Sequence, residues 1–145
     1  MTQNRRFGYG SNLGAASLPP TVLRIESAPH DWLFPRMAAV AHHGGAGTTA
    51  AGLRAGVPSV IIPFFADQPF WGQRVAALGV GPAPVPRRKL TARRLAAALD
   101  AVTGNPQMRR RAVEVAEALR GEDGVGAAVA VVEQFAASPS RSARS

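Results

Sequence analysis

The chain has 145 residues, 46% of them hydrophobic and 18% charged, which is the composition of one globular domain long enough to bury a sizeable core. It contains no cysteine, so disulfide bonds and thiolate metal sites are excluded, and a reducing, cytoplasmic location is expected. No stretch approaches the roughly 18 apolar residues that a membrane span requires, and the first residues lack the apolar core of a signal peptide.

The formal net charge is +8, and all but one of the 17 basic residues are arginine. Such a balance raises three classes of partner: nucleic acid, an anionic membrane surface and acidic small molecules. Much of the positive charge lies in clusters at residues 87–89, 93–94 and 109–111. No aromatic residue is interleaved with these clusters to stack on bases, so solvated helix faces are favoured and no nucleic-acid partner is expected.

The first half of the chain predicts strands that alternate with short helical segments. Residues 1–20 are rich in Gly, Asn, Ser and Pro and are expected to be irregular. The elements expected next are a buried strand at 21–25, a loop at 26–31, a helical turn at 32–36, a strand at 37–41, a Gly-rich turn at 42–48 and a helix at 49–55. Gly56, followed by Val57 and Pro58, is a helix stop signal.

The second half continues the alternation. The expected elements are a strand at 59–63, a loop at 64–68, a helix at 69–78, an edge strand at 80–85, helices at 91–103, 105–120 and 123–135, and a disordered tail at 138–145. The run Val60-Ile61-Ile62 is apolar without alternation, which is typical of a strand covered on both faces in a parallel sheet. We therefore predict an α/β fold, a Rossmann-like parallel sheet with flanking helices, divided into an irregular segment 1–20, a domain 21–136 and a basic tail 137–145.

The most informative motif runs from His42 to Thr49 and reads His-His-Gly-Gly-Ala-Gly-Thr-Thr. Its glycines let a ligand approach the backbone closely, and the helix that follows offers unpaired N–H groups and the positive end of its dipole to an anion. From the motif by itself, a phosphate-binding turn and an ordinary Gly-rich turn between a strand and a helix stay equal alternatives. It is not a Walker loop, because no Gly-Lys-Ser/Thr follows.

Three loops leave the carboxyl ends of the predicted strands, at 26–31, 42–48 and 63–68, and each carries polar residues. Ligands of open α/β sheets bind at these ends, so the three loops are expected to converge on one site. The pair Asp67-Gln68 either caps the following helix or binds vicinal hydroxyls of a polyol. Adjacent histidines in a strand point to opposite faces, so one of His42 and His43 is expected to contact the ligand and the other to pack, and no metal is expected.

Nucleophilic and glycosidase chemistry find no support in the sequence. It contains neither a Gly-x-Ser-x-Gly elbow nor a suggestive pair of carboxylates. No catalytic residue is therefore assigned in this chain.

Four ordered blocks resemble the donor-binding signature of the UDP-glycosyltransferases, especially the sterol-type glucosyltransferases and the antibiotic glycosyltransferases. The blocks are residues 27–35, 42–49, 55–58 and 63–69, and the resemblance covers about residues 21–135. It implies the C-terminal, nucleotide-sugar-binding half of the two-domain GT-B fold. The first strand and the Gly-containing loop of that half are expected to be absent or altered before Thr21, as in an N-terminally truncated domain.

The resemblance also implies residue roles. The donor diphosphate is expected to be bound by His43, Gly45, Gly47 and Thr48, the donor sugar by Asp67 and Gln68, and the nucleobase and ribose by the loop Ser27, Ala28, Pro29 and His30. Two departures affect the nucleoside end: Ser27 stands where the plant-type family has a stacking aromatic, and Ala51 where it has a ribose-binding glutamate.

The implied reaction is an inverting transfer of a hexose, with UDP-glucose as the expected donor and a hydroxyl of a sterol, lipid or natural product as acceptor. The acceptor-binding N-terminal domain, with its general-base histidine, is expected to be missing, and donor binding without transfer is expected of the chain alone. No cofactor is expected, and the basic surface is compatible with a peripheral membrane contact. The alternatives are a non-catalytic truncated remnant and, less favoured, a basic nucleic-acid-binding module.

Overall fold

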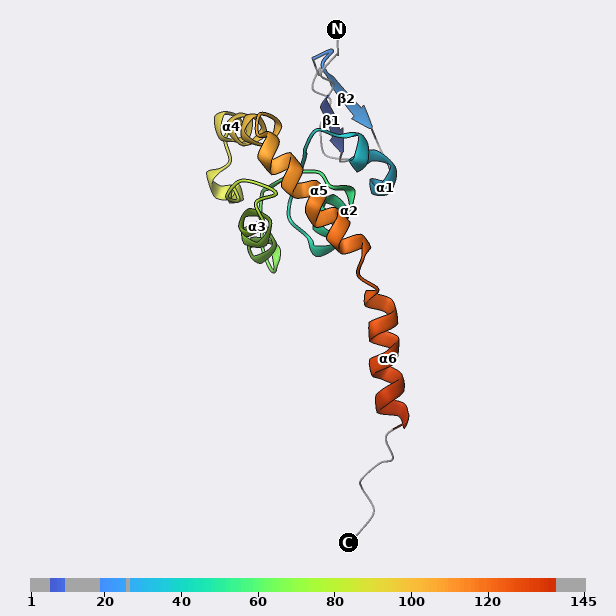
Figure 1. Cartoon of the computed structure of the whole chain (residues 1–145). Helices are drawn as coiled ribbons and strands as arrows, with labels where there is room; N and C mark the ends of the chain where they lie inside the picture. The colour runs from blue at the N-terminus through green and yellow to red at the C-terminus, as the bar shows by residue number, and fades with distance from the viewer. Residues whose placement is uncertain (1–5, 10–18, 26, 138–145) are drawn as a thin grey trace.

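The computed structural model describes residues 6–9, 19–25 and 27–137, in which strands and helices alternate (Figure 1). Two pairs of parallel strands form, β1 (Arg6–Tyr9) with β2 (Val22–Ile25) and β3 (Val40–His42) with β4 (Ser59–Ile61). The helices are α1 (His30–Leu33), α2 (Ala46–Ala55), α3 (Gln68–Ala77), α4 (Ala92–Thr103), α5 (Pro106–Arg120) and α6 (Gly124–Ala137), with 3₁₀ turns η1 (Phe34–Arg36) and η2 (Arg87–Lys89). The expected α/β fold with a parallel sheet is confirmed.

β3, α2 and β4 form the unit that positions the glycine-rich turn. β3 and β4 run parallel with His42 opposite Ile61, and α2 connects them. The helix begins at Ala46 and not at the expected residue 49, because the extended Gly45 is already its N-cap and the Thr49 N–H donates to the Gly45 carbonyl at 2.9 Å. It ends as expected at Gly56, whose φ of +68° is the left-handed conformation typical of a glycine C-cap.

β1 overturns the expectation of a wholly irregular N-terminal segment with no strand before Thr21. It pairs in parallel with β2, Arg6 opposite Val22 and Tyr9 opposite Ile25. Its sequence Arg-Phe-Gly-Tyr contains two aromatic residues, which are common in strands, but the neighbouring glycines hide this signal within a Gly-rich segment. Residues 1–5, 10–18 and 26, and the tail 138–145 expected to be disordered, lie outside the described residues.

The edge strand expected at 80–85 is also wrong. The segment runs beside β4 and is held at its two ends: the Ser59 N–H donates to the Val80 carbonyl and the Val85 N–H to the Ile61 carbonyl, both at 2.9 Å. Between these two bonds the prolines at 82 and 84 have no N–H to donate. The segment therefore extends the layer without completing a strand.

β4 lies at the centre of the core. Val60 and Ile61 are fully buried, and they face different neighbours. Val60 packs with Ala98 and Val102 of α4, whereas Ile61 packs with Val75 of α3. This coverage explains why the sequence of β4 is apolar without alternation.

The C-terminal helices begin where the sequence predicts. Thr91 Oγ1 accepts a hydrogen bond from the Arg94 N–H at 3.2 Å, and Asn105 Oδ1 accepts from Gln107 and Met108 at 3.0 and 3.1 Å. Such side-chain caps fix the start of α4 and α5. α4 then packs against β4, and α5 packs against α2 and α4.

α6 extends away from the body of the molecule (Figure 1). Its exposed apolar side chains are Val125, Val129, Val131, Val132 and Phe135. Among the described residues, none of the helices combines the length and the apolar character that crossing a bilayer requires.

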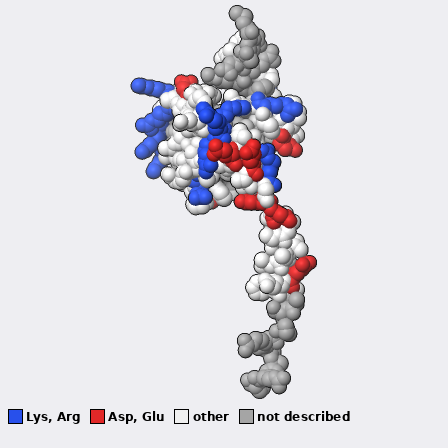
Figure 2. Space-filling model, in the orientation of Figure 1, with Lys and Arg blue, Asp and Glu red and all other residues white. Residues whose placement is uncertain are grey.

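Charge is distributed unevenly along the chain. Residues 68–99 carry six basic and no acidic side chains, whereas residues 112–137 carry five acidic side chains and one basic. Figure 2 shows Lys and Arg side chains gathered on the side of the body where Figure 1 places α3 and α4. We call the basic residues of this 68–99 segment the basic face; its members are Arg74, Arg87, Arg88, Lys89, Arg93 and Arg94.

Candidate functional site

The loops that follow β3 and β4 meet at one edge of the strand layer, as the sequence predicts. Gly44, just after β3, has a φ of +90°, and a Cβ placed on it would lie 2.6 Å from Ile61 Cγ2 and 3.2 Å from the Gln68 carbonyl oxygen. Only glycine fits so close an approach in this conformation. The loop at 26–31 leads into α1, which contacts α2. The structure thus brings the loops at 42–48 and 63–68 together and connects the remaining loop to them through α2.

The amino end of α2 is open. Gly45 is its N-cap and, as a glycine, brings no side chain to the N–H groups of the first turn. A Cβ placed on Gly47 would have no atom of the described residues within 4 Å. Unpaired N–H groups and the positive end of the helix dipole together favour an anion at this position.

His43 lies at this open helix end. Its side chain is exposed, and its Nε2 is 2.5 Å from the position that a Cβ on Gly45 would occupy. The imidazole can take this place because Gly45 has no side chain. Thr48, in the first turn of α2, is half-buried. The residues predicted to bind a diphosphate, His43, Gly45, Gly47 and Thr48, therefore surround one helix terminus, and the binding itself stays a prediction.

His42, the neighbour of His43, turns into the fold. It is half-buried, and its Nδ1 accepts a hydrogen bond from the Gly44 N–H at 3.1 Å. Burial, together with the nearby His43 and His30, lowers the pKa of His42 from 6.5 to about 4. The two adjacent histidines thus differ as expected, one exposed at the open helix end and the other packed and uncharged.

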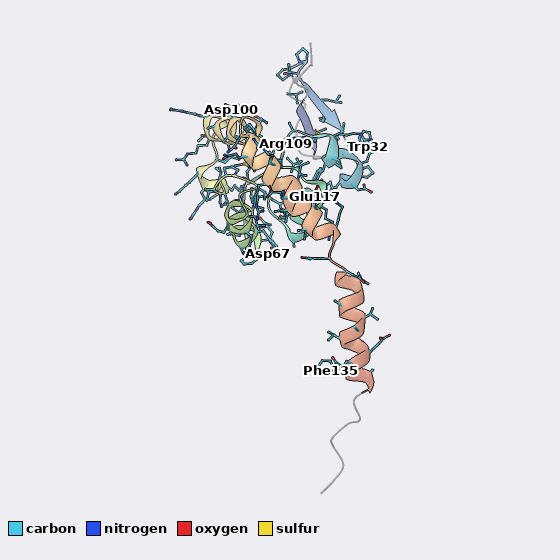
Figure 3. All side chains as sticks on the ribbon, viewed as in Figure 1. Trp32, Asp67, Asp100, Arg109, Glu117 and Phe135 are labelled. Carbon is cyan, nitrogen blue, oxygen red and sulfur yellow. The ribbon has the colours of Figure 1, made fainter. Side chains whose placement is uncertain are left out.

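Asp67 and Gln68 occupy the start of α3. Asp67, which is labelled in Figure 3, is exposed. Its Oδ2 accepts a hydrogen bond from Trp71 Nε1 at 2.8 Å. Among the described residues it caps no helix N–H with its side chain, although it stands at the N-cap position. The capping alternative for Asp67 is therefore not what the structure shows.

Gln68 has a structural role that the sequence did not reveal. Its side chain is buried, and Oε1 accepts hydrogen bonds from the Phe64 and Phe65 N–H groups at 2.8 and 3.2 Å. These bonds hold the loop after β4, in which Ala66 adopts a φ of +55° that is uncommon for a residue with a Cβ. With Oε1 engaged, the amide NH₂ of Gln68 is the group suited to a ligand hydroxyl.

The predicted nucleoside loop precedes α1. Pro29 is the N-cap of α1, and the His30 ring stacks on Phe34 with centroids 4.5 Å apart. Ala28 packs against the core, whereas Ser27 is exposed. Figure 3 shows Trp32, in α1, and Asp67 on different sides of the body.

Sequence reasoning missed two further features beside the site. Thr49 is buried, and its hydroxyl has no hydrogen-bond partner in the part of the chain that the structure describes. It lines, with Trp71, a cavity of about 380 Å³ between α2, α3 and α5.

The second feature is the contact between Phe64 and Arg87. Phe64 is exposed, and the Arg87 guanidinium lies over its ring, 5.1 Å from the ring centroid. The two consecutive phenylalanines after β4, Phe64 and Phe65, are the sequence signal that could have indicated such a contact. Within the described ranges, no group of three or more potential metal-ligating side chains is placed to hold an ion.

The space at Gly44 can be tested by a pair of glycine substitutions. Gly44→Ala is expected to lower the free energy of unfolding by about 2 kcal/mol, because the added Cβ meets Ile61 and the residue keeps a left-handed φ. Gly47→Ala is the control: it adds a methyl group to an open helical position and should leave stability unchanged or raise it by up to about 1 kcal/mol. Urea unfolding of both variants makes the comparison, and equal losses would contradict the packing described here.

The low pKa of His42 predicts a pH dependence of stability. The folded chain binds this proton less readily than the unfolded chain, so the contribution of His42 is complete above about pH 6.5 and is lost as pH falls toward 4. The loss amounts to about 3 kcal/mol over this range. Urea unfolding between these pH values, compared with the same titration of His42→Asn, isolates the effect; identical pH profiles would refute it.

Comparisons with known proteins agree with this geometry. The family model of the erythromycin biosynthesis protein CIII-like C-terminal domain matches residues 7–132. A sterol 3-beta-glucosyltransferase of Arabidopsis thaliana is 48% identical over 126 residues, which are 87% of this chain and 20% of that protein. The O-mycaminosyltylonolide 6-deoxyallosyltransferase of Streptomyces fradiae is 45% identical, over 83% of this chain and 28% of the relative.

Solved structures give the same result. The glycotransferase of kitacinnamycin has a TM-score of 0.75 at 27% identity, and the glycosyltransferase VinC in complex with DTDP has 0.70 at 30%. The matches cover 86% and 81% of this chain but 32% and 31% of those proteins. The chain therefore belongs to the family of erythromycin biosynthesis protein CIII-like C-terminal domains and is a glycosyltransferase donor-binding domain of the GT-B fold.

Proposed function

We propose that the turn after β3 and the amino end of α2 bind the diphosphate of a nucleotide-sugar donor. The observation that carries this proposal is the open helix terminus with the His43 imidazole placed against its N-cap. Helix N–H groups and an imidazole N–H both donate to phosphate oxygens, and the dipole adds a favourable charge interaction.

The same proposal assigns residues to the two ends of the donor, the sugar and the nucleoside. Asp67 and the amide NH₂ of Gln68 bind hydroxyls of the sugar, because a carboxylate accepts and an amide donates. The loop of residues 27–30, which leads into α1, holds the nucleobase and ribose.

UDP-glucose is the donor that we propose. The strongest support is the 48% identity to a sterol 3-beta-glucosyltransferase and the 51% identity to a second one of Arabidopsis thaliana. The solved complex of VinC contains DTDP, which makes thymidine diphosphate the competitor to include in any binding test. The proposed acceptor is a hydroxyl of a sterol, lipid or natural product.

The proposed reaction is an inverting transfer. The acceptor hydroxyl attacks the anomeric carbon, the bond from that carbon to the diphosphate breaks, and the hydroxyl proton passes to a general base. The groups described above stabilise the leaving diphosphate. Since the chain spans about a third of the solved glycosyltransferases that it matches, we assign the acceptor site and the base to the remainder of such an enzyme, and we expect this chain by itself to bind the donor without transferring the sugar.

Calorimetric titration with UDP and UDP-glucose tests the assigned roles. His43→Ala should weaken binding of both ligands by roughly 1–3 kcal/mol, because it removes a hydrogen bond to a charged phosphate. Asp67→Ala should leave UDP affinity unchanged and weaken only UDP-glucose. Asp100→Ala, an exposed carboxylate on α4, is the control and should change neither. No heat with UDP, UDP-glucose or dTDP would favour a non-catalytic remnant.

The basic face supports a peripheral membrane contact as a second part of the proposal. Arg87, Arg88 and Lys89 are exposed in one turn, next to the exposed apolar side chains of Phe64 and Leu90. Anionic lipids attract such side chains by about 1 kcal/mol each, and apolar neighbours can enter the interface. A surface of this kind would bring a lipid acceptor close to the donor site.

Sedimentation with lipid vesicles tests this contact. We expect binding to vesicles of phosphatidylcholine mixed with anionic phosphatidylglycerol, no binding to phosphatidylcholine alone, and loss of binding at high salt. Arg88→Glu should weaken the binding several-fold, whereas Arg120→Glu makes the same charge change outside the basic face and should have a smaller effect. Equal effects of the two variants would show that net charge, and not this surface, is responsible.

A further inference from the structure

The His42 imidazole is the support of the glycine-rich turn. Its Nδ1 accepts the Gly44 N–H at 3.1 Å, one residue beyond His43. Gly44 is confined on its other sides by Ile61 and by the Gln68 carbonyl. The hydrogen bond therefore fixes the amide of a residue that has little room to move, and through it the direction in which the chain leaves β3.

This geometry defines the protonation of His42. A ring nitrogen that accepts a hydrogen bond carries no proton, so the neutral imidazole has its proton on Nε2. That Nε2 is buried without a hydrogen-bond partner among the described residues. The titratable groups that face the ring are His43, with ring centroids 6.3 Å apart, and His30, and both disfavour a positive charge on His42.

We infer that His42 is a positioning residue for donor binding: its uncharged ring holds the Gly44 amide, and thereby directs His43 and the first N–H groups of α2 toward the donor diphosphate. The inference rests on the proposed function of the turn. His42 does not itself contact the phosphate, and its effect passes through the backbone of Gly44 and Gly45.

The step from His42 to the diphosphate is short. Gly44 is followed by Gly45, which is both the N-cap of α2 and the residue on which the His43 ring lies. A rotation of the peptide between residues 43 and 44 would turn the His43 side chain and the N-cap together. Loss of the bond at Nδ1 removes one restraint on that rotation and leaves only the packing against Ile61 and Gln68.

Three substitutions at His42 separate its two nitrogens. His42→Asn keeps an acceptor oxygen close to the position of Nδ1, His42→Gln moves the amide to the position of Nε2, and His42→Leu removes both polar groups. We expect UDP affinity at neutral pH to stay within about threefold in the Asn variant and to fall about 10-fold in the other two. Circular dichroism and thermal unfolding of each variant show that it is folded when titrated.

Nitrogen-15 NMR of the unmodified chain provides a readout that does not depend on activity. The His42 ring should be the Nε2–H tautomer, and the Gly44 amide should exchange with solvent more slowly in the unmodified and Asn chains than in the Gln and Leu variants. A Nδ1–H tautomer, or equal UDP affinities of the Asn and Leu variants, would overturn the inference. If the unmodified chain binds no UDP, the proposed function fails, while the tautomer and the amide exchange still decide whether His42 holds the turn.

Discussion

The close approach of the backbone at Gly44 is the constraint on which the arrangement of the site depends. The turn after β3, the side chain of Ile61 at the end of β4 and the first residue of α3 meet at a point where even a Cβ does not fit. This contact sets the separation of the two loops that follow the strands. It also fixes the direction in which the chain continues from the turn into α2. The amino end of this helix therefore lies at the same edge of the strand layer as Asp67.

The helix end is built for a ligand at a cost in local stability. Serine or aspartate at an N-cap stabilises a helix by about a few tenths of a kcal/mol over glycine. At Gly45 such a side chain would occupy the place of the His43 ring and shield the N–H groups of the first turn. A stronger cap would therefore close the site that the open terminus creates, a conflict between stability and function that is common in binding sites.

Much of the site could be predicted because its parts are local or follow from sheet geometry. His43, Gly45, Gly47 and Thr48 are neighbours in sequence, and Asp67 and Gln68 come to the same edge because parallel strands end together. The structure adds what depends on distant contacts. The pairing of β1 with β2 joins two segments that are separated in sequence, and no local pattern records it. The segment 80–85 failed as a strand for the opposite reason, because its prolines overrule an otherwise suitable environment.

The exposed valines and phenylalanine of α6 have a consequence for how this part of the chain behaves. A helix of 14 residues is marginal in water without tertiary packing, and α6 lies away from the core that stabilises the other helices. Its helical content is therefore tied to whatever covers its apolar side chains. Without such a cover the segment should fray in solution, so the helical content of α6 reports whether its apolar side chains are buried.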